Sequence, residues 1–221
     1  MGAARAGILC LAMAATHAHA HDDAPAAGRA ATPRQVEPMN AAFPAFTRVD
    51  DADAQLEASL ASPAPDAVRV RYRLRNAGAA PLAVFDRGDR HAVLTGRQPA
   101  GAVGAPTFED VGGGDVVLRH VALPSARGGF TGPTLPATPL ALKLAPGDTL
   151  AGEFLFSIPA STPTRRVRWC LGVAAFDEAH FSSPETTADG ELWQADDSAV
   201  RAQRTLCTPW FDLAGGAFAG S

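Results

Sequence analysis

Strict alternation between arginine and apolar side chains over residues 68–75 constrains the fold of this chain more than any other feature. The segment reads VRVRYRLR, and a period of two places one face of an extended strand in water and the other against a core. Asn76 and Gly78, which follow, predict a turn because both residue types tolerate positive φ angles. Pro81 has no amide donor and therefore belongs at the start of the partner strand, 82–85. The segment thus predicts a β-hairpin with one wet face and one buried face.

Short strand patterns separated by turn signals continue along the rest of the chain. Beyond the hairpin, the sequence predicts strands at 43–49, 55–61, 91–94, 108–111, 116–123, 140–144, 149–158, 166–176 and 204–213. One turn of helix is predicted near 191–195, and no helix of ordinary length. About seven to nine short strands with frequent turns predict an all-β, antiparallel sandwich. The long, irregular Gly/Pro-rich loops favour a sandwich over a barrel, which needs more regular strand spacing.

The first twenty residues have the pattern of a secretory signal. Arg5 supplies a positive charge, residues 6–16 form an apolar run, and Ala18-His19-Ala20 fits the preference for small residues at a cleavage site. The apolar run is too short to span a bilayer. We therefore expect residues 1–20 to be a signal peptide and the mature protein to be periplasmic or secreted, with no transmembrane segment after cleavage.

Composition divides the mature chain into three parts. Residues 21–42 are polar, rich in Ala and Pro, and without periodicity, so we expect a flexible N-terminal arm. Residues 43–213 carry the strand patterns and predict one β-sandwich domain, because this length suffices for a single sizeable core. Residues 214–221 are rich in Gly, which predicts a frayed tail.

Charge and cysteine content restrict the classes of partner and site. The formal net charge is −4, and nucleic-acid binding requires clustered basic residues, so we expect no nucleic-acid partner. Cys10 lies in the predicted signal, which leaves Cys170 and Cys207 in an oxidising compartment. An even pair there favours a disulfide over a metal or catalytic site. The strands predicted at 166–176 and 204–213 are consecutive, so we expect them to be neighbours with these cysteines bonded.

Two hairpin motifs carry a resemblance to known proteins. RLRNAGAAPLAVF (73–85) and LAPGDTLAGEFLF (144–156), followed by a long core strand, resemble the hairpins of bacterial exported immunoglobulin-like or fibronectin-III-like β-sandwiches. The resemblance covers about residues 55–213 and implies an immunoglobulin-like fold. It implies no single function, because such folds serve adhesion, inhibition, chaperone and carrier roles. The two cysteines depart from the antibody pattern, since they are close in sequence and Trp169 directly precedes one of them.

The long loops are the predicted location of function. The sequence has no GxSxG or SxxK nucleophile motif. We therefore expect an exported, non-enzymatic binding or structural module without a cofactor, whose partner is an unknown protein or envelope ligand. Binding groups concentrate on loops held by a rigid scaffold, so we expect loops 95–115, 124–139 and 177–198 to gather at one pole.

Three aromatic residues are the candidates for partner binding. Phe130, Phe181 and Trp193 occur where no strand pattern would bury them. They either line a partner-binding surface or fold back as lids over the ends of the sandwich.

A copper site is the alternative function. Cleavage after Ala20 gives His21 a free α-amine beside its imidazole, a pair that chelates Cu(II). Copper monooxygenases with immunoglobulin-like cores use this pair with a second histidine, for which His91, His120 and His180 are the candidates. The alternative is thus a copper-binding carrier or a copper-dependent oxidative enzyme. Such a site needs ligands held by rigid backbone, whereas His21 is the first residue of the predicted flexible arm.

Three further features have ordinary structural interpretations. His120 shares a strand face with apolar residues, which favours a hydrogen-bonded core or edge histidine over a metal ligand. Arg87-Gly88-Asp89 spells an adhesion tripeptide, but a solvated turn is the simpler interpretation. The arginines of residues 68–75 are interpreted as the wet face of an antiparallel sheet, with acidic partners on neighbouring strands.

The signal pattern gives a first prediction. Protein recovered from the cell envelope should begin at His21, because cleavage is expected after Ala20. Mass spectrometry of the native N-terminus measures this directly. An intact Met1 on envelope protein, or a cytosolic location for most of the protein, would contradict the expectation.

Overall fold

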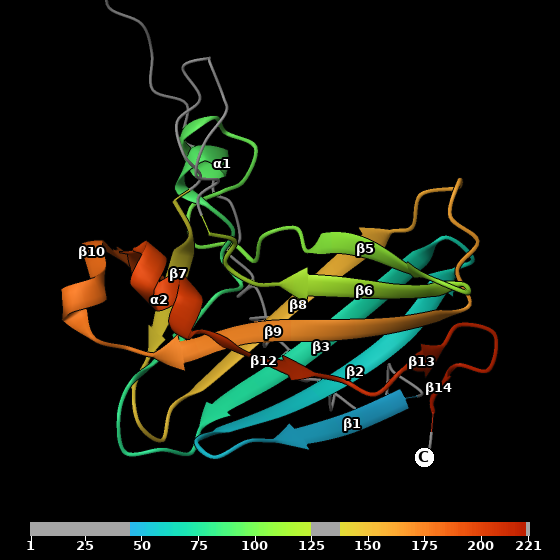
Figure 1. Ribbon diagram of the computed structural model, residues 1–221, viewed down its shortest axis with the longest axis horizontal. Helices are drawn as coiled ribbons and strands as arrows, with labels where there is room; N and C mark the ends of the chain where they lie inside the picture. The colour runs from blue at the N-terminus through green and yellow to red at the C-terminus, as the bar shows by residue number, and fades with distance from the viewer. Residues whose placement is uncertain (1–44, 125–137, 220–221) are drawn as a thin grey trace, which may run out of the picture. The chain divides into compact units, whose positions relative to one another are not determined.

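The structure, a computed structural model, describes residues 45–124 and 138–219, which form two β-sheets (Figure 1). The first sheet, called sheet A here, has four antiparallel strands in the order β1-β2-β3-β8. These strands are β1 (Ala45–Asp50), β2 (Ala54–Ala64), β3 (Ala67–Asn76) and β8 (Thr149–Ser157).

The second sheet, sheet B, is organised around the long strand β9 (Arg166–Ala175). Its main path is β10-β11-β7-β4-β9-β13-β14, with β12 and β6 also paired to β9 and β5 paired to β6. All of these pairs are antiparallel except β6–β9, which is parallel. Besides β9, the strands are β4 (Leu82–Val84), β5 (Thr107–Gly112), β6 (Asp115–His120), β7 (Leu140–Leu144), β10 (Phe181–Thr187), β11 (Gly190–Ala195), β12 (Arg204–Cys207), β13 (Phe211–Asp212) and β14 (Ala217–Phe218).

The main core lies between the two sheets. The alternation over residues 68–75 is confirmed, because Val68, Val70, Tyr72 and Leu74 are buried while the arginines face outward. Tyr72 of sheet A meets Trp169 of sheet B, with ring centroids 4.7 Å apart. The all-β class is therefore confirmed as two packed sheets.

A second apolar cluster covers part of the other face of sheet B. Helix α2 (Asp197–Ala202) contributes Ala199 and Val200 to it, and the loop after β4 contributes Phe85. Phe181 of β10 is also buried in this cluster, with partly buried Phe176 and Trp193 packed against it. Among the described residues, no helix is long and apolar enough to cross a membrane.

The predicted disulfide is present. Cys170 of β9 and Cys207 of β12 are directly opposite each other in the antiparallel register and are bonded. The bond joins residues 37 apart in sequence. Restricting the unfolded chain through a loop of this length stabilises the fold by about 3–4 kcal/mol in the chain-entropy view.

The strand predicted at 91–94 is wrong, since these residues belong to helix α1 (Arg90–Leu94). The Asp89 side chain accepts a hydrogen bond from the Ala92 amide, which is the N-cap interaction that starts a helix. Local capping therefore outweighs the short apolar pattern here.

The helical turn predicted near 191–195 is also wrong. These residues form strand β11, and the helix follows it as α2. Asp196 sets the start of α2 because its carboxylate accepts hydrogen bonds from the amides of Ser198 and Ala199. Phe181 and Trp193, expected outside any strand, consequently lie in β10 and β11.

The ordered fold extends beyond Leu213, the predicted end of the domain. Strand β14 pairs with β13 and places Phe218 opposite Phe211. Phe218 is buried in the main core, and its ring centroid lies 5.6 Å from that of Phe211. The predicted tail, 214–221, therefore includes a core residue.

A glycine in β8 makes room for the tyrosine that spans the core. Gly152 lies directly opposite Tyr72 in the β3–β8 register. A Cβ at Gly152 would lie 2.3 Å from Tyr72 Oη, closer than any real contact. Only glycine at this position lets the Tyr72 ring lie across β8.

Replacing this glycine tests the packing. We expect Gly152→Ala to lower the free energy of unfolding by about 1–3 kcal/mol, the usual cost of overpacking a core. Alanine favours a strand more than glycine does, so a decrease in the free energy of unfolding would report the steric conflict with Tyr72. Urea unfolding measures this decrease, and Thr149→Ala at an exposed position of the same strand is the control. Equal stability of the two variants would contradict the close packing of Tyr72 against Gly152.

Candidate functional site

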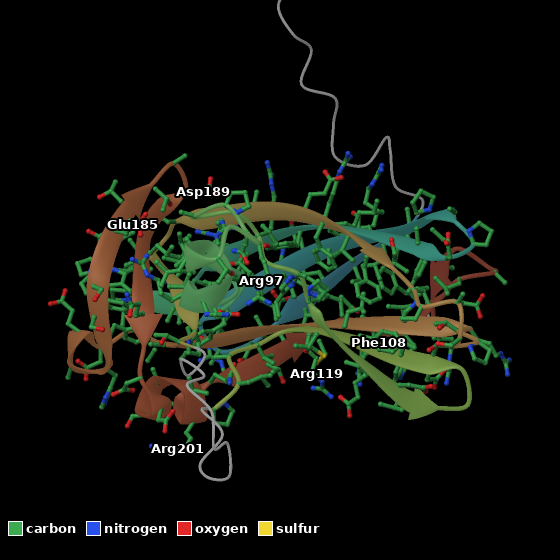
Figure 2. All side chains as sticks on the ribbon, turned by 90° about the horizontal axis from the view of Figure 1, so that it is seen from above. Arg97, Phe108, Arg119, Glu185, Asp189 and Arg201 are labelled. Carbon is green, nitrogen blue, oxygen red and sulfur yellow. A yellow bond between two sulfur atoms is a disulfide. The ribbon has the colours of Figure 1, made fainter. Side chains whose placement is uncertain are left out.

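Four segments meet at the end of the sandwich where α1 lies, and we call this region the loop pole: residues 85–90, 98–106, 120–124 and 138–140. Backbone bonds join them, including Gly104 N to Asp86 O at 2.8 Å and Arg90 N to Thr138 O at 2.8 Å. Figure 2, seen from above, shows α1 between the β10–β11 hairpin, which carries Glu185 and Asp189, and the β5–β6 hairpin.

The predicted gathering of loops is present in part. Residues 98–106 and 138–139 lie at the loop pole, and residues 185–189 adjoin it through the ion pairs Arg90–Glu185 and Arg87–Asp189, at 3.1 and 3.0 Å. Within the predicted loop segment 95–115, residues 107–112 form β5, where a short strand was predicted at 108–111. Most of the predicted excursion 177–198 is the β10–β11 hairpin and part of α2.

The turn that leads into α1 depends on glycine. Gly88 has a φ angle of +68°, and a Cβ there would lie 2.4 Å from Gln98 Oε1. Gln98 in turn donates hydrogen bonds from Nε2 to the carbonyl oxygens of Arg87 and Ala102. The side chain of Gln98 thus ties the two sides of this loop together.

A buried charge cluster lies beneath the loop pole. Asp86 is fully buried and accepts a short hydrogen bond from the Tyr72 hydroxyl. Arg87, 1 % exposed, has its Nε 3.5 Å from Asp86 Oδ1 and donates from Nη2 to Asp189 at 3.0 Å. Asp189 is half exposed, so the cluster runs from the core between the sheets to the surface.

The cluster shifts the ionisation of its members. Burial raises the pKa of the Asp86 carboxyl, and the Arg87 guanidinium and the Tyr72 hydrogen bond offset part of that shift. Burial, together with the nearby Asp86 carboxylate, holds the pKa of Tyr72 well above its ordinary value. Each member therefore relies on the others, because an unpaired buried charge costs several kcal/mol.

His120 is a structural histidine. Trp169 Nε1 donates to His120 Nδ1 at 3.0 Å, so the proton of the neutral ring is on Nε2, which donates to Gly104 O at 2.9 Å. Burial lowers the pKa of the ring, which favours this neutral form. Both nitrogens are thus used within the fold, in agreement with the interpretation of His120 as a core residue.

A small pocket opens between the segments of the loop pole. Its volume is about 140 Å³. More than half of the lining residues are apolar, the polar ones are Asp89, Thr107, Arg119 and His120, and Leu123 in the lining is 56 % exposed. Asp89 is engaged as the cap of α1, and Arg119 pairs with Glu109 at 2.8 Å. The apolar lining residues are Phe85, Ala105, Val121, Ala122, Leu123, Pro139 and Leu140.

Two of the predicted aromatic candidates, Phe181 and Trp193, are not in the lining of this pocket. Phe181 is 6 % exposed and stacks on Phe176, with ring centroids 4.6 Å apart. Trp193 packs edge-on against the same Phe176 ring at 5.2 Å, and Lys143 Nζ lies over both Phe176 and Trp193. The structure thus joins Phe181 and Trp193 in one cluster. Phe130 lies outside the described residues, and partner binding by these three residues stays a prediction.

The adhesion tripeptide is neither presented nor a solvated turn. Arg87 is buried in the charge cluster, and the Asp89 carboxylate caps α1. The interpretation of this tripeptide as a solvated turn is therefore corrected. The sequence analysis did not predict the charge cluster. The available signal was Asp86-Arg87, an acidic and a basic residue directly after a buried strand.

The copper alternative stays a prediction, because its first ligand is not among the residues that the structure describes. His21 lies outside the described residues, and no group of three metal-ligating side chains occurs within residues 45–124 and 138–219. His180 Nδ1 lies 3.1 Å from Asp196 Oδ2, and His91 lies on α1.

Comparison of the chain with protein-family models, with curated proteins and with solved structures gives no match. The function of the chain is therefore inferred from its own geometry.

Tyr72 is the only tyrosine of the chain, which gives a direct spectroscopic test of the buried cluster. The unfolded chain ionises its tyrosine near the ordinary pKa of 10.0, whereas the folded protein retains the phenolic proton. Stability is therefore expected to fall as pH rises above about 10. Tyrosinate absorbance near 295 nm should appear only together with unfolding, followed by circular dichroism. Titration of folded protein near pH 10 would contradict the burial of Tyr72.

Proposed function

We propose that this protein is an exported, non-catalytic binding module with an immunoglobulin-like sandwich, and that its pocket at the loop pole binds an apolar side chain of a protein partner. The observation that carries the proposal is the apolar pocket of about 140 Å³ with the exposed Leu123 in its lining. Export is supported by the sequence pattern of residues 1–20.

The strand order supports the immunoglobulin-like assignment. In such sandwiches, strands A, B and E are neighbours in one sheet and C, F and G are neighbours in the other. Here β2-β3-β8 and β4-β9-β12 take these places in chain order. The parallel β6–β9 pair is an addition to that plan.

The size of the pocket supports a single side chain as its occupant. An apolar cavity of about 150 Å³ accepts benzene, so this pocket suits one aromatic or branched aliphatic group. Burying such a group contributes about 1.5–3 kcal/mol, which makes the pocket an anchor point within a larger contact. The exposed side chain of Leu123 extends the apolar surface at the pocket.

The buried charge cluster supports the proposal because it fixes the backbone around the pocket. Phe85 and Gly88 line the pocket on either side of Asp86 and Arg87, which are held by Tyr72 and Asp189. His120, also in the lining, is fixed by Gly104 and Trp169. Binding sites on fixed backbone lose less entropy when a partner binds.

Site-specific crosslinking in cells tests the proposal. A photo-crosslinking residue replaces Leu123 in the full chain, and a matched variant carries it at Val111, which is similarly exposed on β5. We expect a discrete crosslinked protein from position 123 and not from position 111. Adding Ala105→Trp, which fills the pocket from an exposed lining position, should abolish the product while the melting temperature stays unchanged. No product at position 123, or a product insensitive to Ala105→Trp, would contradict the proposal.

Copper binding is separated from this function by a titration of the processed protein. The α-amine and the imidazole of His21 form the chelate together, and an alanine placed before His21 would create another chelating terminus, so His21→Ala is the matched control. Under the proposed function, the processed protein should bind Cu(II) no more tightly than a short peptide with the same N-terminal residues. Tighter 1:1 binding that His21→Ala removes would favour the copper alternative.

A further inference from the structure

Strand β8 forms an open edge of sheet A. It pairs with β3 along all nine residues without a register shift, and it ends the strand order of the sheet. At the two ends of this pairing, Asn76 N donates to Asp148 O and Ile158 N donates to Asp66 O. Antiparallel pairs alternate between bonded and non-bonded positions, so the even-numbered residues of β8 bond to β3.

The odd-numbered residues of β8 therefore direct their backbone N–H and C=O groups away from the sheet. None of these groups has a hydrogen-bond partner among residues 45–124 and 138–219. All five side chains at these positions are exposed, Leu155 to 56 %. The residues are Thr149, Ala151, Glu153, Leu155 and Ser157.

The other outer strands carry features that discourage pairing, whereas β8 does not. Strand β10 has a bulge between Ser182 and Glu185 that includes Pro184. Strand β5 has a bulge after Asp110, and β1 is only six residues long. Proteins usually protect a sheet edge with bulges, proline, charge or short length. Strand β8 is long, regular and free of proline, and its single charge, Glu153, is bound by Arg69 and Arg71 at 3.4 and 2.8 Å.

Unpaired positive charge lies next to this edge. Arg73 and Arg75 of β3 lie opposite Ala151 and Thr149 of β8 and are exposed. Neither arginine forms an ion pair within the described part of the chain, and Glu57, opposite Arg73 on β2, instead lies 3.8 Å from Arg48. The short side chains of Ala151 and Thr149 leave both guanidiniums free to extend toward a strand added beside β8, about 10 Å from β3 at the usual spacing.

We propose that the open edge of β8 binds an extended acidic segment of a partner protein as a fifth strand of sheet A. Main-chain hydrogen bonds to the odd-numbered residues of β8 supply the attachment, which is the geometry of β-strand addition. Carboxylates at alternate positions of the segment meet Arg73 and Arg75 on the outer face, while its other side chains extend the apolar inner face. This edge is separate from the pocket at the loop pole, so the two surfaces are tested independently.

A pair of synthetic peptides tests the proposal on the mature protein. The acidic probe is Thr-Val-Glu-Val-Glu-Val-Thr, and its matched control carries Lys in place of both Glu residues. Calorimetry should give saturable binding of the acidic peptide and at least about tenfold weaker binding of the lysine peptide. Hydrogen exchange followed by NMR should show new protection at the odd-numbered amides of β8 only in the presence of the acidic peptide.

Two variants locate the binding. Ala151→Pro removes an N–H that β3 does not use, so it should leave the melting temperature unchanged and abolish binding. The double variant Arg73→Glu with Arg75→Glu should weaken binding at least about tenfold, while Arg97→Glu in the loop after α1 has no effect. The second variant keeps the test decisive if Ala151→Pro unfolds the protein.

Three outcomes overturn the proposal. The first is equal binding of both peptides, and the second is binding without protection of the β8 amides. The third is protection of those amides without any peptide when the protein concentration is raised, together with an increase in molecular mass. That result would show that the edge pairs with a second copy of this chain.

Discussion

The hydrogen bond from Tyr72 to the buried carboxylate of Asp86 is the interaction on which the rest of the structure depends. Tyr72 belongs to sheet A, and Asp86 follows the last paired residues of β4 in sheet B, so the bond joins the two sheets through the core. It also has a strict steric requirement, because the Tyr72 ring lies over Gly152. Without its partners, Asp86 would be an isolated buried charge, which proteins avoid at a cost of several kcal/mol.

This constraint explains why the loop pole holds a defined shape. Arg87 is drawn inward by Asp86 and reaches Asp189 of the β10–β11 hairpin, so segments distant in sequence share one charge cluster. The charged groups of the loop pole are engaged in structure, which leaves an apolar pocket as its available surface. Sheet A presents a different surface, in which the outward-facing backbone of β8 lies next to the exposed side chains of Arg73 and Arg75. The two surfaces proposed for binding are thus chemically distinct.

The sequence predicted those parts of the fold that depend on local pattern. The period of two over residues 68–75 identified the buried face of β3, and an even pair of cysteines on strands expected to be neighbours predicted the Cys170–Cys207 bond. The two strands, β9 and β12, are neighbours in the sheet although β10 and β11 lie between them in the chain. Helix α1 was missed because one capping carboxylate, Asp89, outweighs a short apolar run. The Asp86-Arg87 pair indicated a charged site directly after β4, but the pocket and the full charge cluster depend on contacts that are distant in sequence. Asp86 pairs with Tyr72, and Arg87 pairs with Asp189, 102 residues further along the chain. Nothing in the local sequence around Asp86 specifies these distant partners.

A double-mutant cycle on Tyr72 and Asp86 tests the central claim most directly. The free energy of unfolding is measured in urea at pH 7 for wild type, Tyr72→Phe, Asp86→Ala and the double variant. A hydrogen bond to a buried charged group predicts a coupling energy of about 1.5–3 kcal/mol, because each single change already removes the same interaction. If the losses of the two single variants add up to the loss of the double variant within about 0.5 kcal/mol, Tyr72 and Asp86 act independently, which would contradict the central role of their hydrogen bond.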